Sequence, residues 1–208
     1  MTAPTKISFV RHGHVHNPER IMYGRLPGFG LSESGREQAR AAAVTLQDRP
    51  LAALFSSPQL RARQTAEIIL APHDGLTLSI SPWLNEIHTP YEGWPVEELA
   101  ARDWDIYSGI EPHYEQPPDI LDRVQQFVAE VRQQYAGQQT LAVTHGDNIL
   151  FMLFWARGLP VATGENKKLL SQLGLPDLYP VPASITTFVY QTTTPDEIPT
   201  FEYVKPYA

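Results

Sequence analysis

Two stretches of this chain share one pattern: Phe9-Val10-Arg11-His12-Gly13 and Ala142-Val143-Thr144-His145-Gly146. Each runs from a short apolar segment directly into a histidine and a glycine, which predicts a buried strand with a histidine at its carboxyl end. Ligands of open α/β sheets bind beyond the carboxyl ends of the strands. The sequence therefore predicts that His12 and His145 face one crevice.

Strands and helices are predicted to alternate around these two stretches. The predicted strands lie at residues 7–10, 51–55 and 141–144, and the predicted helices lie at residues 32–48, 57–70, 119–135 and 146–157. Ser57 and Asp119 are placed to cap the second and third of these helices. A β-α-β-α order predicts parallel strands joined by helical crossovers.

Two irregular stretches interrupt this order, at about 72–118 and 159–182, and both are rich in proline and glycine. They carry only weak helix signals, around residues 96–106 and 165–173. Long irregular segments in a compact domain tend to be functional, so we expect both stretches to cover the site.

The C-terminal part alternates in the manner of two further strands, at residues 184–191 and 198–204. We expect these strands at an edge of the sheet, where they could pair two copies of the chain into a homodimer. No repeat or linker divides the 208 residues, so a single domain is predicted over residues 1–208.

The composition excludes several kinds of chemistry. The chain has 23 acidic and 16 basic residues and a formal charge of -7, so it offers no general attraction to nucleic acid or to an anionic membrane. It has no cysteine, which excludes disulfides, thiolate catalysis and cysteine-ligated metals. The N-terminal segment lacks the apolar core of a secretory signal, and the longest apolar run, 149–156, is too short to span a bilayer. A soluble cytoplasmic protein is expected.

Two arginines lie near the predicted crevice. Arg11 precedes His12, and Arg61 lies in the first turn of the helix after the second strand. A guanidinium can bind two phosphate oxygens at once, and a helix that begins at Gly146 offers free N–H groups to an anion. A neutral imidazole can attack phosphorus without first losing a proton. These residues predict a phosphate pocket with a histidine nucleophile.

Such a reaction also needs an acid for the leaving oxygen. Glu86 is the best candidate because it lies among aromatic and apolar residues in the first irregular stretch, and Glu92 and Glu97 are its competitors. Partial burial near an anionic phosphate favours the protonated form of a carboxyl group. We expect Glu86 to protonate the leaving alcohol and later to deprotonate water.

Five motifs in a fixed order resemble those of the histidine phosphatase superfamily, the phosphoglycerate-mutase-like group of enzymes. They are Arg11-His12-Gly13, residues 31–39, residues 56–66, Leu84-Asn85-Glu86 with Glu92-Gly93, and Thr144-His145-Gly146. The resemblance implies that His12 is phosphorylated and that Glu86 is the proton donor. It also implies that Arg11, Arg61 and His145 bind the phosphoryl group.

The same resemblance implies the fold and the remaining contacts. It implies a three-layer α/β/α sandwich with a mostly parallel central sheet, and neither a metal nor another cofactor. Asn17 falls near the position of a phosphate ligand in the family. Tyr23, Gly24 and Arg25 fall roughly where related enzymes contact the substrate.

Hydrolysis is favoured over phosphoglycerate-mutase action. The mutases carry Glu-Arg-His-Tyr-Gly at the acid, whereas this chain has Glu86-Ile87-His88-Thr89-Pro90. The Arg and Tyr that grip the substrate carboxylate are therefore missing. The resemblance predicts a phosphatase that acts on a small phosphate monoester, with mutase-type phosphotransfer as the alternative.

Two further alternatives come from other classes of protein. His12, His14 and His16 alternate at a strand end and could share one face as metal ligands, which would give a metal-dependent hydrolase. A noncatalytic sensor of phosphorylated ligands could be built on the same pocket. Loss of a histidine or an arginine would mark such a sensor, but both histidines and both arginines are present.

Overall fold

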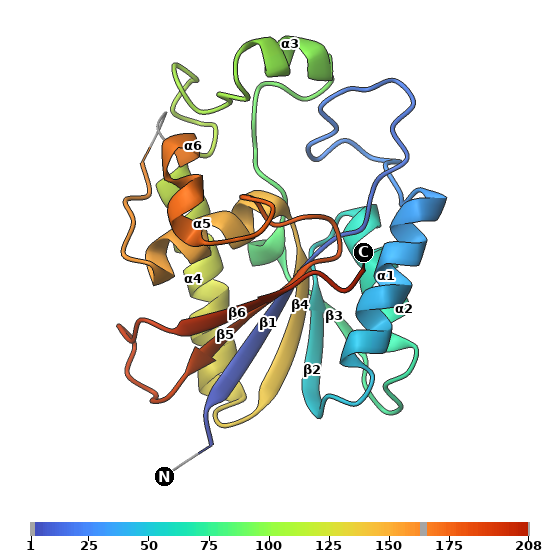
Figure 1. The fold of residues 1–208 in the computed structure, drawn as a ribbon, viewed down its shortest axis with the longest axis vertical. Coiled ribbons are helices and arrows are strands. Elements are labelled where there is room, and N and C mark those ends of the chain that lie inside the picture. Colours follow the sequence, from blue (N-terminus) through green and yellow to red (C-terminus); the bar gives the residue numbers. More distant parts are fainter. Residues whose placement is uncertain (1–2, 163–165, 208) are drawn as a thin grey trace.

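A six-stranded mixed sheet runs through the middle of the protein (Figure 1). This computed structural model describes residues 3–162 and 166–207. Across the sheet the strands follow one another as β3 (Leu78–Ile80), β2 (Leu51–Ser56), β4 (Gln139–Thr144), β1 (Thr5–Arg11), β5 (Ile185–Tyr190) and β6 (Thr200–Val204). The first four are parallel, whereas β5 pairs antiparallel with β1 and β6 pairs antiparallel with β5. The prediction of parallel strands, with two further strands at one edge, is confirmed.

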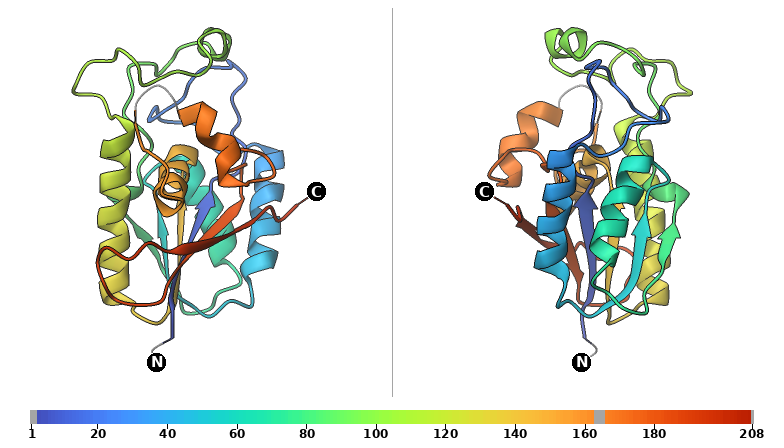
Figure 2. Two further views of the ribbon diagram at one scale, coloured as in Figure 1. Left: turned by 60° about the vertical axis from the view of Figure 1, so that its left-hand side comes forward. Right: turned by 90° about the vertical axis from the view of Figure 1, so that its right-hand side faces the viewer.

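Helices cover both faces of this sheet (Figure 2). They are α1 (Glu33–Leu46) and α2 (Leu60–Leu70) on one face, and α4 (Pro117–Gln134) and α5 (Gly146–Ala156) on the other. Within β1, Ile7 and Phe9 pack with α4 and α5, while Val10 packs with α1 and α2. Because side chains alternate along a strand, burial of both faces requires the continuous apolar run seen in the sequence. The predicted three-layer α/β/α sandwich is confirmed.

The register of β1 and β4 brings the two histidines to the same level. Arg11 pairs with Thr144, so His12 and His145 are the residues that leave the sheet next. The His12 N–H donates to the Thr144 carbonyl at 3.0 Å. Both histidines therefore stand at the carboxyl edge of the parallel strands, as predicted.

The two irregular stretches contain only short elements. They are β3, the 3₁₀ turn η1 (Pro82–Leu84) and α3 (Val96–Ala101) in the first, and α6 (Asn166–Leu169) and the 3₁₀ turn η2 (Leu170–Leu173) in the second. The predicted helix signal near 165–173 begins outside the described residues, at Glu165. β3 was not predicted because three residues, two of them exposed, carry no readable pattern. Across 3–162 and 166–207, no helix is both long and apolar enough to cross a membrane.

The first irregular stretch is tied to the loop between β1 and α1. Figure 1 shows α3 and this loop together at the end of the molecule toward which β1 points. The Met22 N–H donates to the Trp94 carbonyl at 2.7 Å, and the Val96 N–H donates to the Arg20 carbonyl at 2.8 Å. The two segments therefore form one layer beyond the strand ends.

Two helices begin differently from the prediction. The residue that precedes α2 as its N-cap is Gln59 and not Ser57, because the Ser57 hydroxyl lies against His145. Asp119 is not the N-cap of α4 but lies in its first turn, where its carboxylate accepts the Gln116 N–H at 2.9 Å. The Ser57 difference places an additional polar group in the site.

Candidate active site

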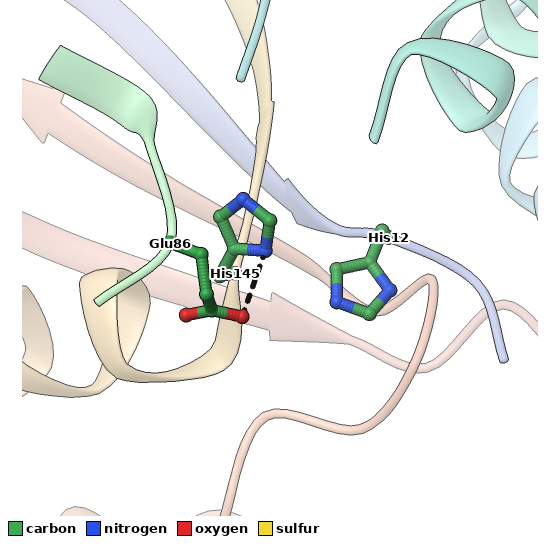
Figure 3. A group of neighbouring side chains, drawn as sticks. All are labelled: His12, Glu86 and His145. Atoms are coloured by element: carbon green, nitrogen blue, oxygen red, sulfur yellow. Dashed lines mark ion pairs between the residues drawn. The ribbon is translucent and has the colours of Figure 1, made fainter. Parts of the chain in front are cut away.

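His12 is buried and presents one ring nitrogen to the site (Figure 3). Its Nδ1 lies 2.8 Å from the Gly13 carbonyl oxygen, which can only accept a hydrogen bond. Nδ1 therefore carries the proton and Nε2 keeps a free electron pair. Burial, together with the nearby Arg61, His145 and Arg11, holds the pKa of His12 well below its usual value of 6.5. The ring is neutral at pH 7 and has a nucleophilic nitrogen.

Arg61 lies at the centre of the site and is fully buried. Its Nη2 donates to the Gly24 carbonyl at 2.8 Å and to Glu86 Oε2 at 3.0 Å, and its Nε lies 3.3 Å from His12 Nε2. Its Nη1 is buried without a hydrogen-bond partner among the described residues. An unpaired buried guanidinium donor requires an explanation, and an anionic oxygen of a ligand beside His12 supplies one.

His145 joins the site from the end of β4, and its ring centroid lies 5.2 Å from that of His12. Its Nδ1 lies 3.1 Å from Glu86 Oε2, and its Nε2 lies 2.7 Å from Ser57 Oγ. Because a carboxylate only accepts, Nδ1 carries the proton and the Ser57 hydroxyl donates to Nε2. Burial, reinforced by Arg61, lowers the pKa of His145 to about 4 although Glu86 opposes this shift. His145 is therefore a neutral donor that points its N–H into the site.

Glu86 follows η1 and turns its carboxylate toward Arg61 and His145, as Figure 3 shows for the histidine. Its other oxygen accepts the Ile87 N–H at 3.0 Å. Burial raises the pKa of Glu86, but His145, Arg61 and His12 together hold it well below 4.5. These contacts keep the carboxylate ionised, whereas the protonated form predicted from the sequence requires an anionic phosphate beside Glu86.

An open pocket of about 270 Å³ lies against His12, whereas Arg61, Glu86 and His145 do not line it. The residues that line it are Arg11, His12, Gly13, His14, Val15, Asn17, Arg20, Tyr23, Val96 and Pro182. Arg11 forms one wall, where its Nη1 donates to the Pro180 carbonyl at 2.7 Å and its guanidinium lies 5.2 Å from the Tyr179 ring centre. The Arg11 Nε has no partner among the described residues, so a donor remains for a ligand.

The predicted substrate contacts differ in how directly they border the site. Tyr23 lines the pocket and lies beneath the Arg61 guanidinium, 4.6 Å from it, and Gly24 contributes the carbonyl that Arg61 binds. Asn17 lines the pocket, but its amide already bonds to both backbone groups of Ile21. Tyr23 and Gly24 therefore border the predicted site directly, whereas Asn17 first serves to close its own loop.

Arg25 does not line the pocket. Its Nε donates to the Glu86 carbonyl at 2.7 Å, and its Nη2 donates to Glu115 at 2.8 Å. The guanidinium therefore braces the backbone that carries Glu86. Sequence position alone could not show this, because the partner Glu115 lies far along the chain.

The rival trio of His12, His14 and His16 is not brought together. In the described part of the chain, the one group of three potential metal ligands is His12, Glu86 and His145. His14 is exposed, and its Nδ1 lies 2.9 Å from the Ser32 hydroxyl. Between the members of that group lies the Arg61 guanidinium, and a metal cation there would meet its charge at close range. These donors fit a site for an anion better than a site for a metal.

A half-buried aspartate connects both irregular stretches to this site. Asp147, in the first turn of α5, accepts hydrogen bonds from the hydroxyls of Tyr107 and Tyr179. Tyr107 belongs to the first irregular stretch and Tyr179 to the second. We call these three residues the aspartate clasp. Single-sequence patterns did not reveal it, because its members lie 32 and 40 positions from Asp147.

The aspartate clasp needs a residue without a side chain at position 146, because the Tyr179 hydroxyl lies where a Cβ atom would be. A Cβ atom at this position would lie 2.1 Å from the Tyr179 hydroxyl oxygen. We expect Gly146→Ala to lower the free energy of unfolding by roughly 1–3 kcal/mol, measured by denaturant titration, although alanine favours helices. In a Tyr179→Ala background the same change should cost little. An equal cost in both backgrounds would contradict the collision.

The chain is similar in sequence or in fold to several known proteins. Over 152 residues the chain is 40% identical to Rv0525 of Mycobacterium tuberculosis, covering 70% of this chain and 75% of that protein. It is 29% identical over 150 residues to the Bacillus subtilis phosphatase PhoE, covering 72% and 76%. The mycobacterial glucosyl-3-phosphoglycerate phosphatase Rv2419c has the same fold, with a TM-score of 0.75, 24% identity and coverage of 96% and 97%. Residues 7–175 match the histidine phosphatase superfamily (branch 1), and the chain belongs to that family.

Proposed function

We propose that this protein is a phosphatase that hydrolyses a small phosphate monoester through a phosphohistidine on His12. The observation that carries the proposal is the arrangement of His12 and Arg61. The unprotonated Nε2 of a buried, neutral imidazole accepts the Arg61 Nε–H at 3.3 Å, and Nη1 of the same guanidinium has no partner among the described residues. This pairing suits a nucleophile whose target carries negatively charged oxygens.

In the first half of the reaction, His12 Nε2 attacks phosphorus and the bond between phosphorus and the alcohol oxygen breaks. Arg11, Arg61 and the Nδ1–H of His145 hold the phosphoryl oxygens. The charge of the bound phosphate opposes the contacts that keep Glu86 ionised and so favours its protonated form. A phosphate monoanion, whose second pKa is about 6, can supply that proton. Glu86 then delivers the proton to the leaving oxygen.

In the second half, water attacks the phosphohistidine and the phosphorus–nitrogen bond breaks. The Glu86 carboxylate takes the proton from water, and inorganic phosphate leaves. His12 returns to its neutral form with Nε2 free, so no cofactor is consumed. Hydrolysis is preferred to mutase transfer because residues 86–90 lack the Arg and Tyr of the mutases and Arg25 is occupied by Glu115. The names of PhoE and Rv2419c point the same way.

The test of this function is a leaving-group series with Glu86→Gln. For alkyl phosphates, whose leaving alkoxide needs a proton, we expect kcat/KM to fall on the order of 10²-fold or more. For 4-nitrophenyl phosphate, whose leaving group is stable as an anion, the loss of kcat/KM should be less than about ten-fold, because kcat/KM reports the steps up to release of the leaving group and not the later attack of water. Phosphate release would be measured in the presence of a chelator.

Glu92→Gln is the matched control, because Glu92 lies in the same stretch but its carboxylate accepts the Arg25 N–H, whereas that of Glu86 contacts Arg61 and His145. Its effect should not depend on the leaving group. Unchanged turnover of alkyl phosphates by Glu86→Gln would remove Glu86 from the mechanism. Loss of wild-type activity with the chelator, and its recovery with zinc or manganese, would contradict the phosphohistidine proposal.

A further inference from the structure

The pocket beyond the phosphate groups has a cationic outer wall. Next to His12 and Arg11, the lining continues through Asn17, Arg20 and Val96. Arg20 is the only lysine or arginine besides Arg11 among the residues that line this pocket, and no carboxylate lines it. Since His12 and Arg11 hold the phosphoryl group in the proposed reaction, the alcohol half of the substrate lies toward Arg20.

Arg20 has a backbone conformation that favours glycine. Its φ is +52°, in the left-handed region. Two hydrogen bonds fix this conformation: the Arg20 N–H donates to the Asn17 carbonyl at 3.2 Å, and the Arg20 carbonyl accepts the Val96 N–H at 2.8 Å. A glycine would meet these constraints with less strain than an arginine does.

Packing of the side chain does not compensate for this strain. The Arg20 side chain is 69% exposed, and its one ion pair among the described residues, 2.7 Å to Glu97 Oε1, has a partner that is 59% exposed. Exposed ion pairs of this kind contribute little to stability. A strained residue that gives little stability, at the mouth of a pocket, indicates a role in binding.

We infer that Arg20 binds a second anionic group, a carboxylate or another phosphate, on the alcohol half of the substrate. This inference rests on the proposed function and names its substrate class. The guanidinium exchanges the Glu97 carboxylate for that group when substrate enters. Glu97 thus acts as a weak internal competitor, which favours ligands whose anion makes stronger, charge-assisted hydrogen bonds to Arg20.

The experiment uses nonhydrolysable ligands, so that it does not depend on turnover. Propylphosphonate and 3-phosphonopropionate have chains of similar length, but only the second carries a carboxylate, and propane-1,3-bisphosphonate carries a second phosphonate. Their Kd values for the full chain would be measured by calorimetry. We expect the wild type to bind one or both of the ligands that carry a second anionic group about ten-fold more tightly than propylphosphonate, and the preferred one identifies the second anion.

Two variants should move this preference in opposite directions. Arg20→Gly should abolish the preference, because the ligands with a second anionic group lose far more affinity than propylphosphonate does. It should also raise Tm, because it relieves the backbone strain. Glu97→Gln should strengthen the preference, because it removes the competing carboxylate. Arg40→Gln is the control, since Arg40 is exposed on α1 and does not line the pocket.

The outcomes separate the inference from the function on which it rests. Equal losses of affinity for all three ligands in Arg20→Gly, or a preference that survives the change, would overturn the role of Arg20. Normal phosphonate binding without hydrolysis of any monoester would overturn the phosphatase proposal and leave the anion preference in place. A chain that binds none of the phosphonates would contradict both.

Discussion

Replacing His12 by asparagine is expected to lower kcat for phosphate release by about 10⁴-fold or more, because no other group can form the covalent intermediate. The Nε2 electron pair of His12 is the one that Arg61 approaches at 3.3 Å, and the ring is held by the bond between Nδ1 and Gly13. Asparagine keeps a polar side chain in the buried position. Steady-state phosphate release, with circular dichroism to verify folding, checks this result.

The intermediate itself gives a second readout. A phosphate ester labelled with radioactive phosphorus should transfer the label to the wild-type chain, and peptide mapping should place it on His12. His16→Asn is the matched control, since His16 is four positions away, is exposed and does not line the pocket. It should retain both label and turnover. A stable phosphate complex without covalent label would support the sensor alternative, and transfer of the label to a second ester would support a mutase.

The placement of His12 and His145 could be predicted from the sequence because it depends on local patterns and one general rule. A short apolar run predicts a buried strand, and parallel strands share one carboxyl edge. The paired register of Arg11 and Thr144 then makes the two histidines neighbours. Arg61 was predicted for a similar reason, because it lies in the first turn of the helix that follows β2.

Other features could not be predicted because they depend on contacts between distant segments. Ser57 has the residue type of a helix cap, and only the position of His145 shows that its hydroxyl serves the site instead. Arg25 is two positions from the pocket residue Tyr23, yet its side chain binds the Glu86 carbonyl and Glu115 and does not line the pocket. The protonation state of Glu86 is a third case, since burial and charge act on it in opposite directions.

Arg61 is expected to matter for both catalysis and stability, and two substitutions separate these roles. Arg61→Lys keeps a positive charge but loses the planar fork that reaches His12, Glu86 and the ligand together. We expect kcat/KM to fall about 10²- to 10³-fold, the loss typical of removing one preorganised donor to a developing charge. Steady-state kinetics on 4-nitrophenyl phosphate would measure it, since that substrate does not depend on Glu86 as acid.

Arg61→Ala should in addition lower the free energy of unfolding by about 3–5 kcal/mol at pH 7, because Glu86 is left ionised and nearly buried without its cation. Arg61 helps to hold the pKa of Glu86 below 4.5, so its stabilising contribution is complete above that pH and is lost as pH falls through the folded-state pKa. The stability difference between wild type and variant should therefore narrow below about pH 4.5. Adding Glu86→Gln to Arg61→Ala should recover part of the loss at pH 7. Two results would contradict this explanation: a difference in unfolding free energy that stays constant with pH, and a double variant in which the two losses of unfolding free energy simply add. They would mean that Arg61 stabilises the fold through its packing against Tyr23 and not through the charge of Glu86.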